Sequence, residues 1–282
     1  MYVRPVERAI LYILIALGVF LPLIFPFEKW PNLPTPEVRG VYDTIEGLQP
    51  GDTIMVAVDF DPSSEPELYP MLLAVLRHAF AKDLYVLGVC LFNPAGAGLG
   101  VAAFTTVGDE FGKVNGEDYC FLGYKPNLLA VVRGMNQDIA RMFTVDAFGR
   151  PTRGMPIIQR TPRLRGGIKY LVDLAAGETV RPWVAYGSTP GGYPMGAGCT
   201  AVSFADYFAF YQSGQINGLM GGLKAAAEYE ELVKMKGAAS AGMNSQSIVH
   251  VLLVLFIIMG NYIYFRGLAA RRRGQPQSGG AR

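Results

Sequence analysis

The sequence predicts an α/β fold, with a doubly wound, mostly parallel sheet flanked by an N-terminal and a C-terminal transmembrane helix. Two observations support this prediction. In the middle of the chain, short apolar runs alternate with amphipathic segments, which is typical of βαβ units and a parallel sheet. Towards each end of the 282-residue chain, which is 51% hydrophobic, lies a long stretch without a formal charge.

The N-terminal stretch runs from Ala9 to Phe27. A helix rises about 1.5 Å per residue and needs roughly 20 apolar residues to cross a bilayer, so this stretch is just long enough. Arg4 and Arg8 precede it, as in a signal peptide, but no small-x-small cleavage site follows it. We therefore expect residues 1–27 to hold a short tail and an uncleaved membrane helix.

The C-terminal stretch, Ile248 to Phe265, predicts a second span, with a buried core helix as the alternative. Its polar residues His250 and Asn261 favour packing against a protein neighbour rather than lipid. Arginines lie outside both spans, at positions 4 and 8 and in the tail 266–282. The positive-inside rule then places both termini in the cytoplasm, in a cell membrane, and the segment between the spans outside the cytoplasm.

Between the spans we expect one α/β domain over residues 37–236, a normal size for a single core. A proline-rich stem, residues 28–36, precedes it, and a linker of small and polar residues, 237–247, follows it.

The first half of this domain reads as three strand–helix units. Their predicted order is strand Thr53–Asp59, helix Glu67–Ala81, strand Leu84–Phe92, helix Gly98–Phe111, strand Tyr119–Tyr124 and helix Asn127–Phe143.

The second half reads less regularly. We predict a helix over Gly167–Ala176, strands over Val180–Tyr186 and Cys199–Ser203, and one or two helices over Ala205–Lys236. Residues 187–199, rich in glycine, predict an irregular loop.

Polar residues follow the first predicted strand: Asp59, Asp61, Ser63 and Ser64. Ligands collect beyond the carboxyl ends of strands in open α/β sheets, so these residues are candidates for holding a ligand or a divalent metal. The alternative is structural: Ser63 or Ser64 caps the next helix, whose first turn carries Glu65, Pro66 and Glu67. We favour the structural interpretation.

Other chemical motifs are incomplete. Residues 93–100, NPAGAGLG, lack the Lys-Ser/Thr of a phosphate-binding loop and do not fit GxGxxG, so we predict no cofactor. His78 and His250 are the two histidines of the chain, which argues against a histidine-built zinc site and against Ser188 or Cys199 as a His-activated nucleophile. The three cysteines form neither a disulfide framework nor a metal-ligand spacing. We predict no catalytic residue.

A basic segment runs from residue 150 to residue 169 without an acid. Its cations are Arg150, Arg153, Arg160, Arg163, Arg165 and Lys169. They suit an anionic lipid, a polyanion or an acidic patch on another subunit, or else a solvated loop. Among the partners we favour protein, because Met155, Ile157 and Ile158 interrupt the charges.

Gly214, Gly218 and Gly222 are spaced four residues apart. Within a predicted helix they would form one face that permits close packing, either against the sheet of the same domain or against another subunit.

Together these features predict a non-catalytic integral membrane scaffold or binding subunit of a larger membrane-associated assembly. The expected partners are the lipid bilayer and either further copies of the chain or other membrane-protein subunits. Nucleic acid is not expected, because residues 28–247 carry 18 Lys/Arg against 22 Asp/Glu. The alternative is a membrane-anchored hydrolase or metal-dependent enzyme with its site at the carboxyl ends of the strands.

Overall fold

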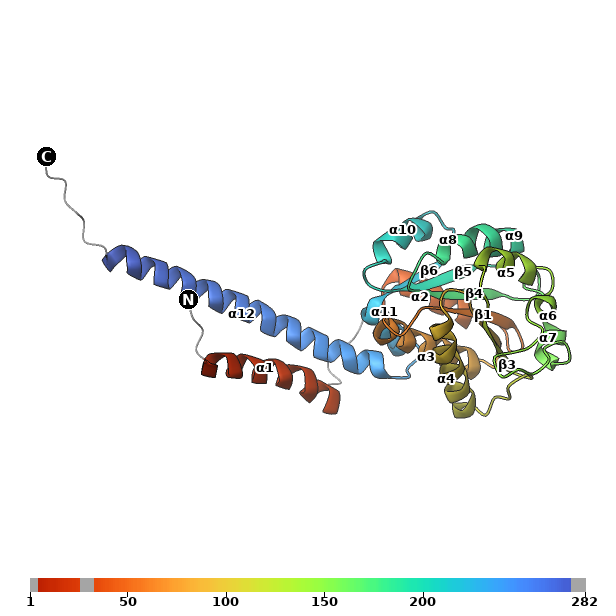
Figure 1. Ribbon diagram of the computed structural model, residues 1–282, viewed down its shortest axis with the longest axis horizontal. Helices are drawn as coiled ribbons and strands as arrows, with labels where there is room; N and C mark the ends of the chain where they lie inside the picture. The colour runs from red at the N-terminus through yellow and green to blue at the C-terminus, as the bar shows by residue number, and fades with distance from the viewer. Residues whose placement is uncertain (1–4, 26–32, 275–282) are drawn as a thin grey trace. The chain divides into compact units, whose positions relative to one another are not determined.

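The computed structural model describes residues 5–25 and 33–274 of the chain. It divides into two compact units, Pro31–Ser240 and a smaller unit of Met1–Trp30 with Ala241–Arg282. The larger unit is an α/β domain (Figure 1). Residues 28–32 of the predicted stem and residues 275–282 of the predicted tail lie outside the described residues.

The domain is built on a sheet of six strands in the order β3-β2-β1-β4-β5-β6, and every strand pair is parallel. The strands are β1 (Thr53–Asp59), β2 (Tyr85–Cys90), β3 (Tyr119–Tyr124), β4 (Tyr170–Ala175), β5 (Met195–Cys199) and β6 (Gly218–Gly221). The predicted parallel sheet is thus confirmed. The direction of winding reverses between β1 and β4, which makes their carboxyl ends the topological switch point.

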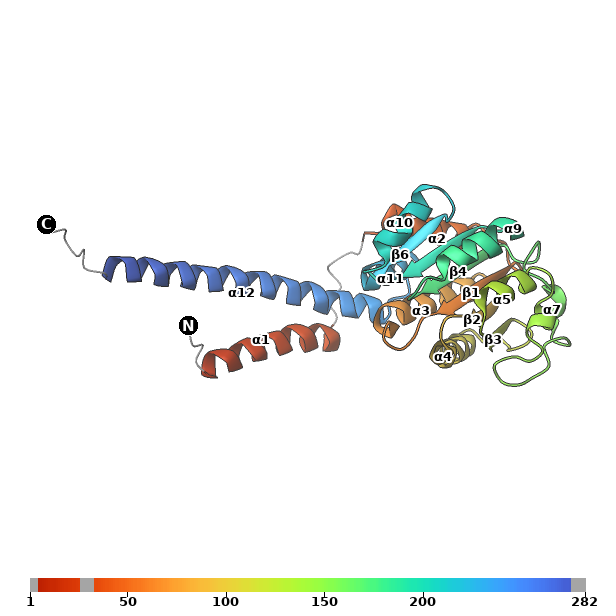
Figure 2. The same ribbon diagram turned by 45° about the horizontal axis from the view of Figure 1, so that its top comes forward.

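Helices flank both faces of the sheet (Figure 2). Those on one face are α2 (Pro36–Glu46), α3 (Glu65–Ala81), α4 (Pro94–Glu110) and α11 (Gly222–Leu232). The other face is covered by α5 (Leu128–Met135), α6 (Ile139–Met142), α7 (Pro156–Arg160), α8 (Val180–Pro182), the π-helix η1 (Trp183–Ser188), α9 (Thr189–Gly191) and α10 (Phe204–Gln212).

The core explains why the strands are apolar along their whole length. All seven residues of β1 are buried, because helices cover both faces of this central strand. Met55 and Ala57 face the side of Trp183, together with Leu171 and Ala175 of β4. Asp59 and Asp173 follow the same alternation and face that side too.

The first half of the domain forms largely as predicted. The bounds of β1 and β3 are confirmed, and β2 lies within its predicted range. The helix predicted over 127–143 is instead broken into α5 and α6, because Asp138 starts a new helix by accepting the amide of Arg141 at 2.9 Å. Helix α2 was not predicted.

The second half corrects several predictions. Gly167–Ala176, predicted as a helix, contains β4, and Val180–Tyr186, predicted as a strand, forms α8 and the start of η1. A short apolar run fits a buried strand and a buried helix equally well, and only the neighbouring strands β1 and β5 decide between them. The predicted strand Cys199–Ser203 begins where β5 ends.

The predicted glycine face is also wrong, because its residues do not share a helix. Gly214 lies in a turn with φ +71°, Gly218 opens β6, and Gly222 begins α11 with φ +66°. A Cβ on Gly218 would lie 2.3 Å from the amide nitrogen of Val41 in α2. Gly218 therefore permits a close approach within the domain.

The smaller unit holds α1 (Pro5–Ile24) and most of α12 (Ala238–Gly274). Within α12, the segment Ala238–Leu268 is the one described helix that is long and apolar enough to cross a membrane. The apolar part of α1, Arg8–Ile24, is shorter at 17 residues. Residues 238–247, predicted as a linker, are already helical.

The two helices of this unit contact each other. Ser245 donates a hydrogen bond of 3.0 Å to the carbonyl of Val19, and a Cβ on Gly18 would lie 2.7 Å from Leu252. The side chain of Asn261, by contrast, donates to the carbonyl of Ile257 in its own helix at 3.0 Å.

The first turn of α12 is capped by Glu230, a buried residue of α11. Its carboxylate accepts the amides of Gly237, Ala239 and Ser240 at 2.9, 3.1 and 2.8 Å, and the Ser240 hydroxyl at 2.6 Å. Amides in the first turn of a helix lack partners within the helix, so this one carboxylate satisfies several of them.

Candidate functional site

Asp59 ends β1 and is fully buried. Its Oδ1 accepts the amide of Leu91 at 2.6 Å, and its Oδ2 accepts the indole N–H of Trp183 at 2.9 Å. This carboxyl thus joins the end of β1 to the loop after β2 and to η1.

A second buried carboxyl, Asp173 of β4, lies on the same face. Asp173 is the register partner of Ala57, and Asp59 is the partner of Ala175, so the two acids are one strand repeat apart on neighbouring strands. Asp173 Oδ2 accepts the hydroxyl of Thr179 at 2.9 Å, whereas its Oδ1 has no partner that donates to it. The sequence did not reveal Asp173, because its segment was predicted to be helical.

Burial raises the pKa of both carboxyls. It raises the pKa of Asp59 to about 6, against hydrogen bonds from Trp183 and Leu91 that lower it. Burial and the charge of Asp59 raise the pKa of Asp173 well above its usual range. Each carboxyl also affects the other: Asp173 lowers the pKa of Asp59, and Asp59 raises the pKa of Asp173, so the protonated form is favoured more strongly at Asp173.

A cavity of about 380 Å³ lies at the carboxyl ends of the strands beside this pair. It is lined by Leu91, Phe92, Asn127, Leu128, Leu129, Glu178, Thr179 and Pro182. Leu91 and Thr179 are also the residues that bond to the two acids. The acid pair therefore positions two walls of the cavity, which lies at the switch point where ligands bind in such sheets.

Asp61 does not join Asp59. Its Oδ1 accepts the amide and the hydroxyl of Ser63 at 3.0 and 2.5 Å in a local turn. Ser64 occupies the N-cap position of α3 but makes no capping hydrogen bond, so the predicted serine cap is wrong. Among the residues that the structure describes, no group of three His, Cys, Asp or Glu side chains is placed to hold a metal.

The glycines of NPAGAGLG serve packing. Asn93 caps α4 by accepting the amide of Ala95 at 3.0 Å. A Cβ on Gly96 would lie 2.2 Å from the carbonyl oxygen of Phe60, so glycine lets α4 approach the end of β1.

The candidate nucleophiles are either held in a hydrogen bond or kept protonated by burial. Ser188 is buried and donates to the carbonyl of Tyr193 at 2.7 Å. Burial raises the pKa of Cys90, Cys120 and Cys199 to about 12, and all three are free thiols.

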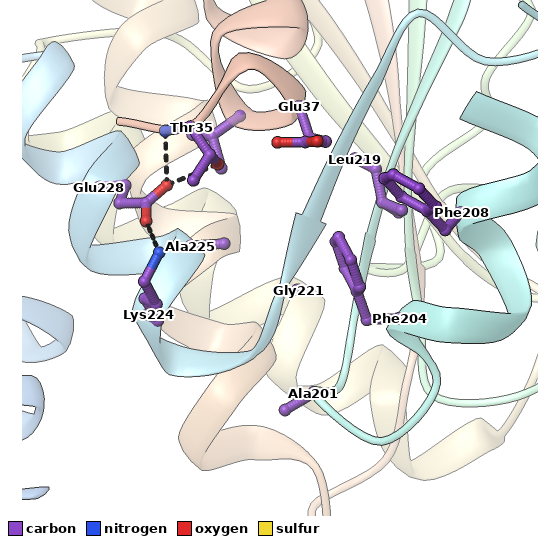
Figure 3. A pocket seen from close by; sticks show the side chains of 11 residues that line it. Thr35, Glu37, Ala201, Phe204, Phe208, Leu219, Gly221, Lys224, Ala225 and Glu228 are labelled. Atoms are coloured by element: carbon purple, nitrogen blue, oxygen red, sulfur yellow. Dashed lines mark hydrogen bonds and ion pairs between the residues drawn. The ribbon is translucent and has the colours of Figure 1, made fainter. Parts of the chain in front are cut away.

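A larger cavity of about 520 Å³ lies beside β6 (Figure 3). On one side Glu228 accepts the amide and the hydroxyl of Thr35 at 3.0 and 2.8 Å and forms an ion pair with Lys224. Phe204 and Phe208 of α10 line the opposite side. The cavity thus combines an aromatic wall with a charged rim, and nothing in the sequence pattern had indicated it.

The basic segment is partly structural. Arg150 pairs with Asp146 at 2.6 Å, and Arg160 stacks on the ring of Tyr85, 4.1 Å from its centroid. The apolar residues that favoured a protein partner, Met155, Ile157 and Ile158, are buried in the core, so that argument no longer holds. The remaining cations are exposed and form no ion pair within the described part of the chain: Arg153, Arg163, Arg165 and Lys169.

Comparison with known proteins gives little. No protein family and no curated protein matches the sequence. The solved structures that resemble the chain include the apo structure of OtsA, with 11% identity, 77% of this chain and 46% of that chain covered, and a TM-score of 0.34. Another is the trehalose-6-phosphate synthase OtsA, with 9% identity, coverage of 83% and 49%, and a TM-score of 0.31. The chain spans about half the length of these structures, and similarity at this level does not bear on function.

Proposed function

We propose that the chain is a two-span membrane protein that acts without catalysis as a scaffold or binding subunit of a larger membrane-associated assembly. The observation that carries this proposal is the apolar segment Ala238–Leu268, 31 residues long, most of whose residues from Val251 onward are exposed. Ile257 and Ile258, for example, are 63% and 60% exposed. Contiguous apolar surface of this extent needs a lipid or protein environment.

Helix α1 supplies the first span in this proposal. Its 20 residues rise roughly 30 Å, about the thickness of the hydrocarbon core. Gly18 and Pro22 are buried, and Gly18 faces α12, while apolar side chains such as Phe20 remain exposed. One small residue at a helix contact with apolar residues elsewhere is the arrangement that packs two helices within a bilayer.

The proposed topology places both termini in the cytoplasm and the α/β domain outside it, because arginines concentrate at the chain ends. Binding is favoured over catalysis because the reactive groups are withdrawn from the cavities: Asp59 and Asp173 are fully buried, and the thiols hold their protons. The proposed partners are the lipid bilayer and either further copies of the chain or other membrane-protein subunits.

Single engineered cysteines test the topology, because the native thiols are buried. Val3→Cys, Val202→Cys and Ser278→Cys are labelled in intact cells with a membrane-impermeant maleimide. Two spans predict labelling at residue 202 alone. Labelling at residues 3 and 202 but not at 278 would mean that only α12 spans the membrane. Labelling at residues 3 and 278 alone would mean that the orientation is the reverse of the one proposed.

Native mass spectrometry in mild detergent tests the assembly. A homo-oligomer or a defined multi-subunit particle supports the scaffold role. A lone protomer that carries a stoichiometric metal or small molecule would replace it with the enzymatic alternative.

One observation favours that alternative, a membrane-anchored hydrolase or metal-dependent enzyme. A carboxyl that keeps its proton beside a switch-point cavity has the charge state that a general acid needs. If it is a metal enzyme, divalent ions raise the melting temperature of the chain, and Asp59→Asn combined with Asp61→Asn abolishes the rise. A melting temperature that does not change when divalent ions are added counts against a metal-dependent enzyme.

A further inference from the structure

A cavity of about 360 Å³ lies between α5, the segment that leads into β4, and η1. It is lined by Arg133, Asn136, Gln137, Arg165, Ala185, Tyr186 and Pro190, and no acidic residue is among them. We call it the Arg133–Arg165 pocket. Sequence analysis singled out Arg165 but not Arg133.

Arg133 and Arg165 are both exposed, and they differ from half-buried cations of the domain in their lack of an ion pair. Arg77 pairs with Glu110 at 2.7 Å and Lys113 with Asp83 at 2.6 Å. Neither Arg133 nor Arg165 forms an ion pair with any carboxylate of the described chain. Asp138, close to Arg133 in sequence, is occupied in capping α6.

The wall of the pocket that η1 forms is held in place by specific contacts. The Asn136 amide donates to the carbonyls of Tyr186 and Gly187, each at 3.2 Å. These carbonyls belong to η1. A π-helix is rare in proteins, and where one occurs it is often at a functional site. A Cβ on Gly187 would lie 3.0 Å from the Tyr193 hydroxyl and 3.0 Å from Val132, so η1 packs tightly against its neighbours.

The aromatic ring of this wall orients one of the cations. The guanidinium carbon of Arg133 lies 4.3 Å from the centroid of the Tyr186 ring. Stacking restricts the guanidinium plane and leaves its N–H groups free to donate in that plane.

We propose that the Arg133–Arg165 pocket binds a phosphate-type oxyanion carried by a small molecule or by a lipid headgroup. Two guanidiniums without carboxylate partners offer forked donors that match phosphate oxygens. The volume exceeds what inorganic phosphate fills and lies in the range of small-ligand sites, which leaves room for an organic body against Tyr186 and Pro190. The pocket lies wholly within the α/β domain, so the inference goes beyond membrane anchoring and does not depend on the number of spans.

The test uses the full chain in nanodiscs of neutral phosphatidylcholine, titrated at constant ionic strength with inorganic phosphate and with phenyl phosphate. The variants are Arg133→Gln and Arg165→Gln. The control is Arg163→Gln, which removes the same charge from an exposed arginine of the basic segment that does not line the pocket. We expect each pocket variant to lose at least about tenfold in affinity, while the control stays near the wild type.

A second arm identifies the source of the anion. Nanodiscs that contain phosphatidic acid replace the soluble phosphates, and the melting temperature of each variant is measured. Arginine-dependent stabilisation by phosphatidic acid alone supports a lipid headgroup, and stabilisation by phenyl phosphate supports a soluble ligand. The proposal is wrong if neither phenyl phosphate nor phosphatidic acid binds in a way that depends on Arg133 and Arg165. It is also wrong if Arg163→Gln loses as much affinity as the pocket variants. Arg133→Lys, which keeps the charge without the fork, preserves the test if Arg133→Gln fails to fold.

Discussion

Two buried titratable clusters lie on opposite faces of the sheet and differ in how completely their polar atoms are partnered. One is the acid pair, Asp59 with Asp173. The other is the His78 cluster, in which Nδ1 of His78 lies 2.8 Å from the Tyr229 hydroxyl and Nε2 lies 2.9 Å from Glu46. Both ring nitrogens of His78 have partners, and Tyr42 stacks on the ring with 4.8 Å between the ring centroids, whereas one buried oxygen of Asp173 has no hydrogen-bond partner.

The clusters respond to pH in opposite directions. Burial favours the neutral form of both, so it raises the pKa of the carboxyls and lowers the pKa of His78. Raising the pH therefore destabilises the acid pair, and lowering it destabilises the His78 cluster. A buried group whose polar atoms all have hydrogen-bond partners needs no ligand to explain it. A buried group that lacks a partner and lies beside a cavity is the place to test for ligand binding.

The largest expected effect is that of Asp59→Ala, which leaves the Leu91 amide and the Trp183 indole N–H buried without an acceptor. We expect a loss of about 3 kcal/mol in the free energy of unfolding, because each unsatisfied buried donor costs roughly 1–3 kcal/mol. Denaturant unfolding of the full chain in detergent measures it. Asp61→Ala, which removes a surface-turn carboxylate, should cost less than about 1 kcal/mol. Equal losses would show that Asp59 does not hold the site together.

His78→Gln should cost about 2 kcal/mol at pH 7.5, because it disturbs contacts to both Tyr229 and Glu46. The wild type should also lose stability as the pH falls below about 6.5, since the unfolded chain then binds a proton that the folded chain, with its lowered His78 pKa, resists. The variant should lack this part of the acid sensitivity. A loss of stability below about pH 6.5 that is the same in the variant and the wild type would contradict this role of His78.

Asp173→Asn should change stability by about 1 kcal/mol, since asparagine keeps the size of the side chain and an oxygen that accepts the Thr179 hydroxyl. Its stronger signature is in the pH dependence. Above about pH 4 the unfolded chain has released carboxyl protons that the folded acid pair keeps, so raising the pH towards 6 and beyond favours unfolding. In the variant the melting temperature should fall less steeply as the pH rises. An unchanged fall would mean that groups other than Asp173 cause it.

A similarly small effect is expected for Tyr229→Phe, which deletes the hydroxyl that is hydrogen-bonded to His78 Nδ1 but keeps the buried ring. A loss of about 1 kcal/mol is expected for one hydrogen bond. A loss as large as that of His78→Gln would mean that the tyrosine, not the histidine, organises the contact between α2, α3 and α11.

The sequence predicted the first half of the sheet well, because its strands are uniformly apolar and are separated by amphipathic helices. It failed where local pattern and tertiary context disagree. The run around Leu171 becomes a strand only because β1 and β5 hydrogen-bond to it on either side. The glycines of β6 have low strand propensity, and they are there for close packing: Gly218 admits α2, and Gly221 admits Phe204 of α10.

The candidate sites were predictable only in part. Asp59 was found because it ends a recognisable strand, whereas Asp173 was hidden in a segment predicted as a helix. Arg165 stood out within a run of cations, but Arg133 sits alone in an amphipathic helix. Arg133 and Arg165 line the same pocket because α5 and the segment that precedes β4 both border it. No spacing in the sequence indicates that these two residues share a pocket.

The Glu230 cap has a consequence for how the chain is made. Residues of α11 emerge from the ribosome before those of α12, and Glu230 can satisfy the amides of Gly237, Ala239 and Ser240 only once α11 has formed and the chain has turned back onto it. The first turn of α12 thus becomes complete only after α11 has folded. A nascent chain whose α/β domain is misfolded carries its longest apolar helix without this cap, which ties the start of α12 to the quality of the domain.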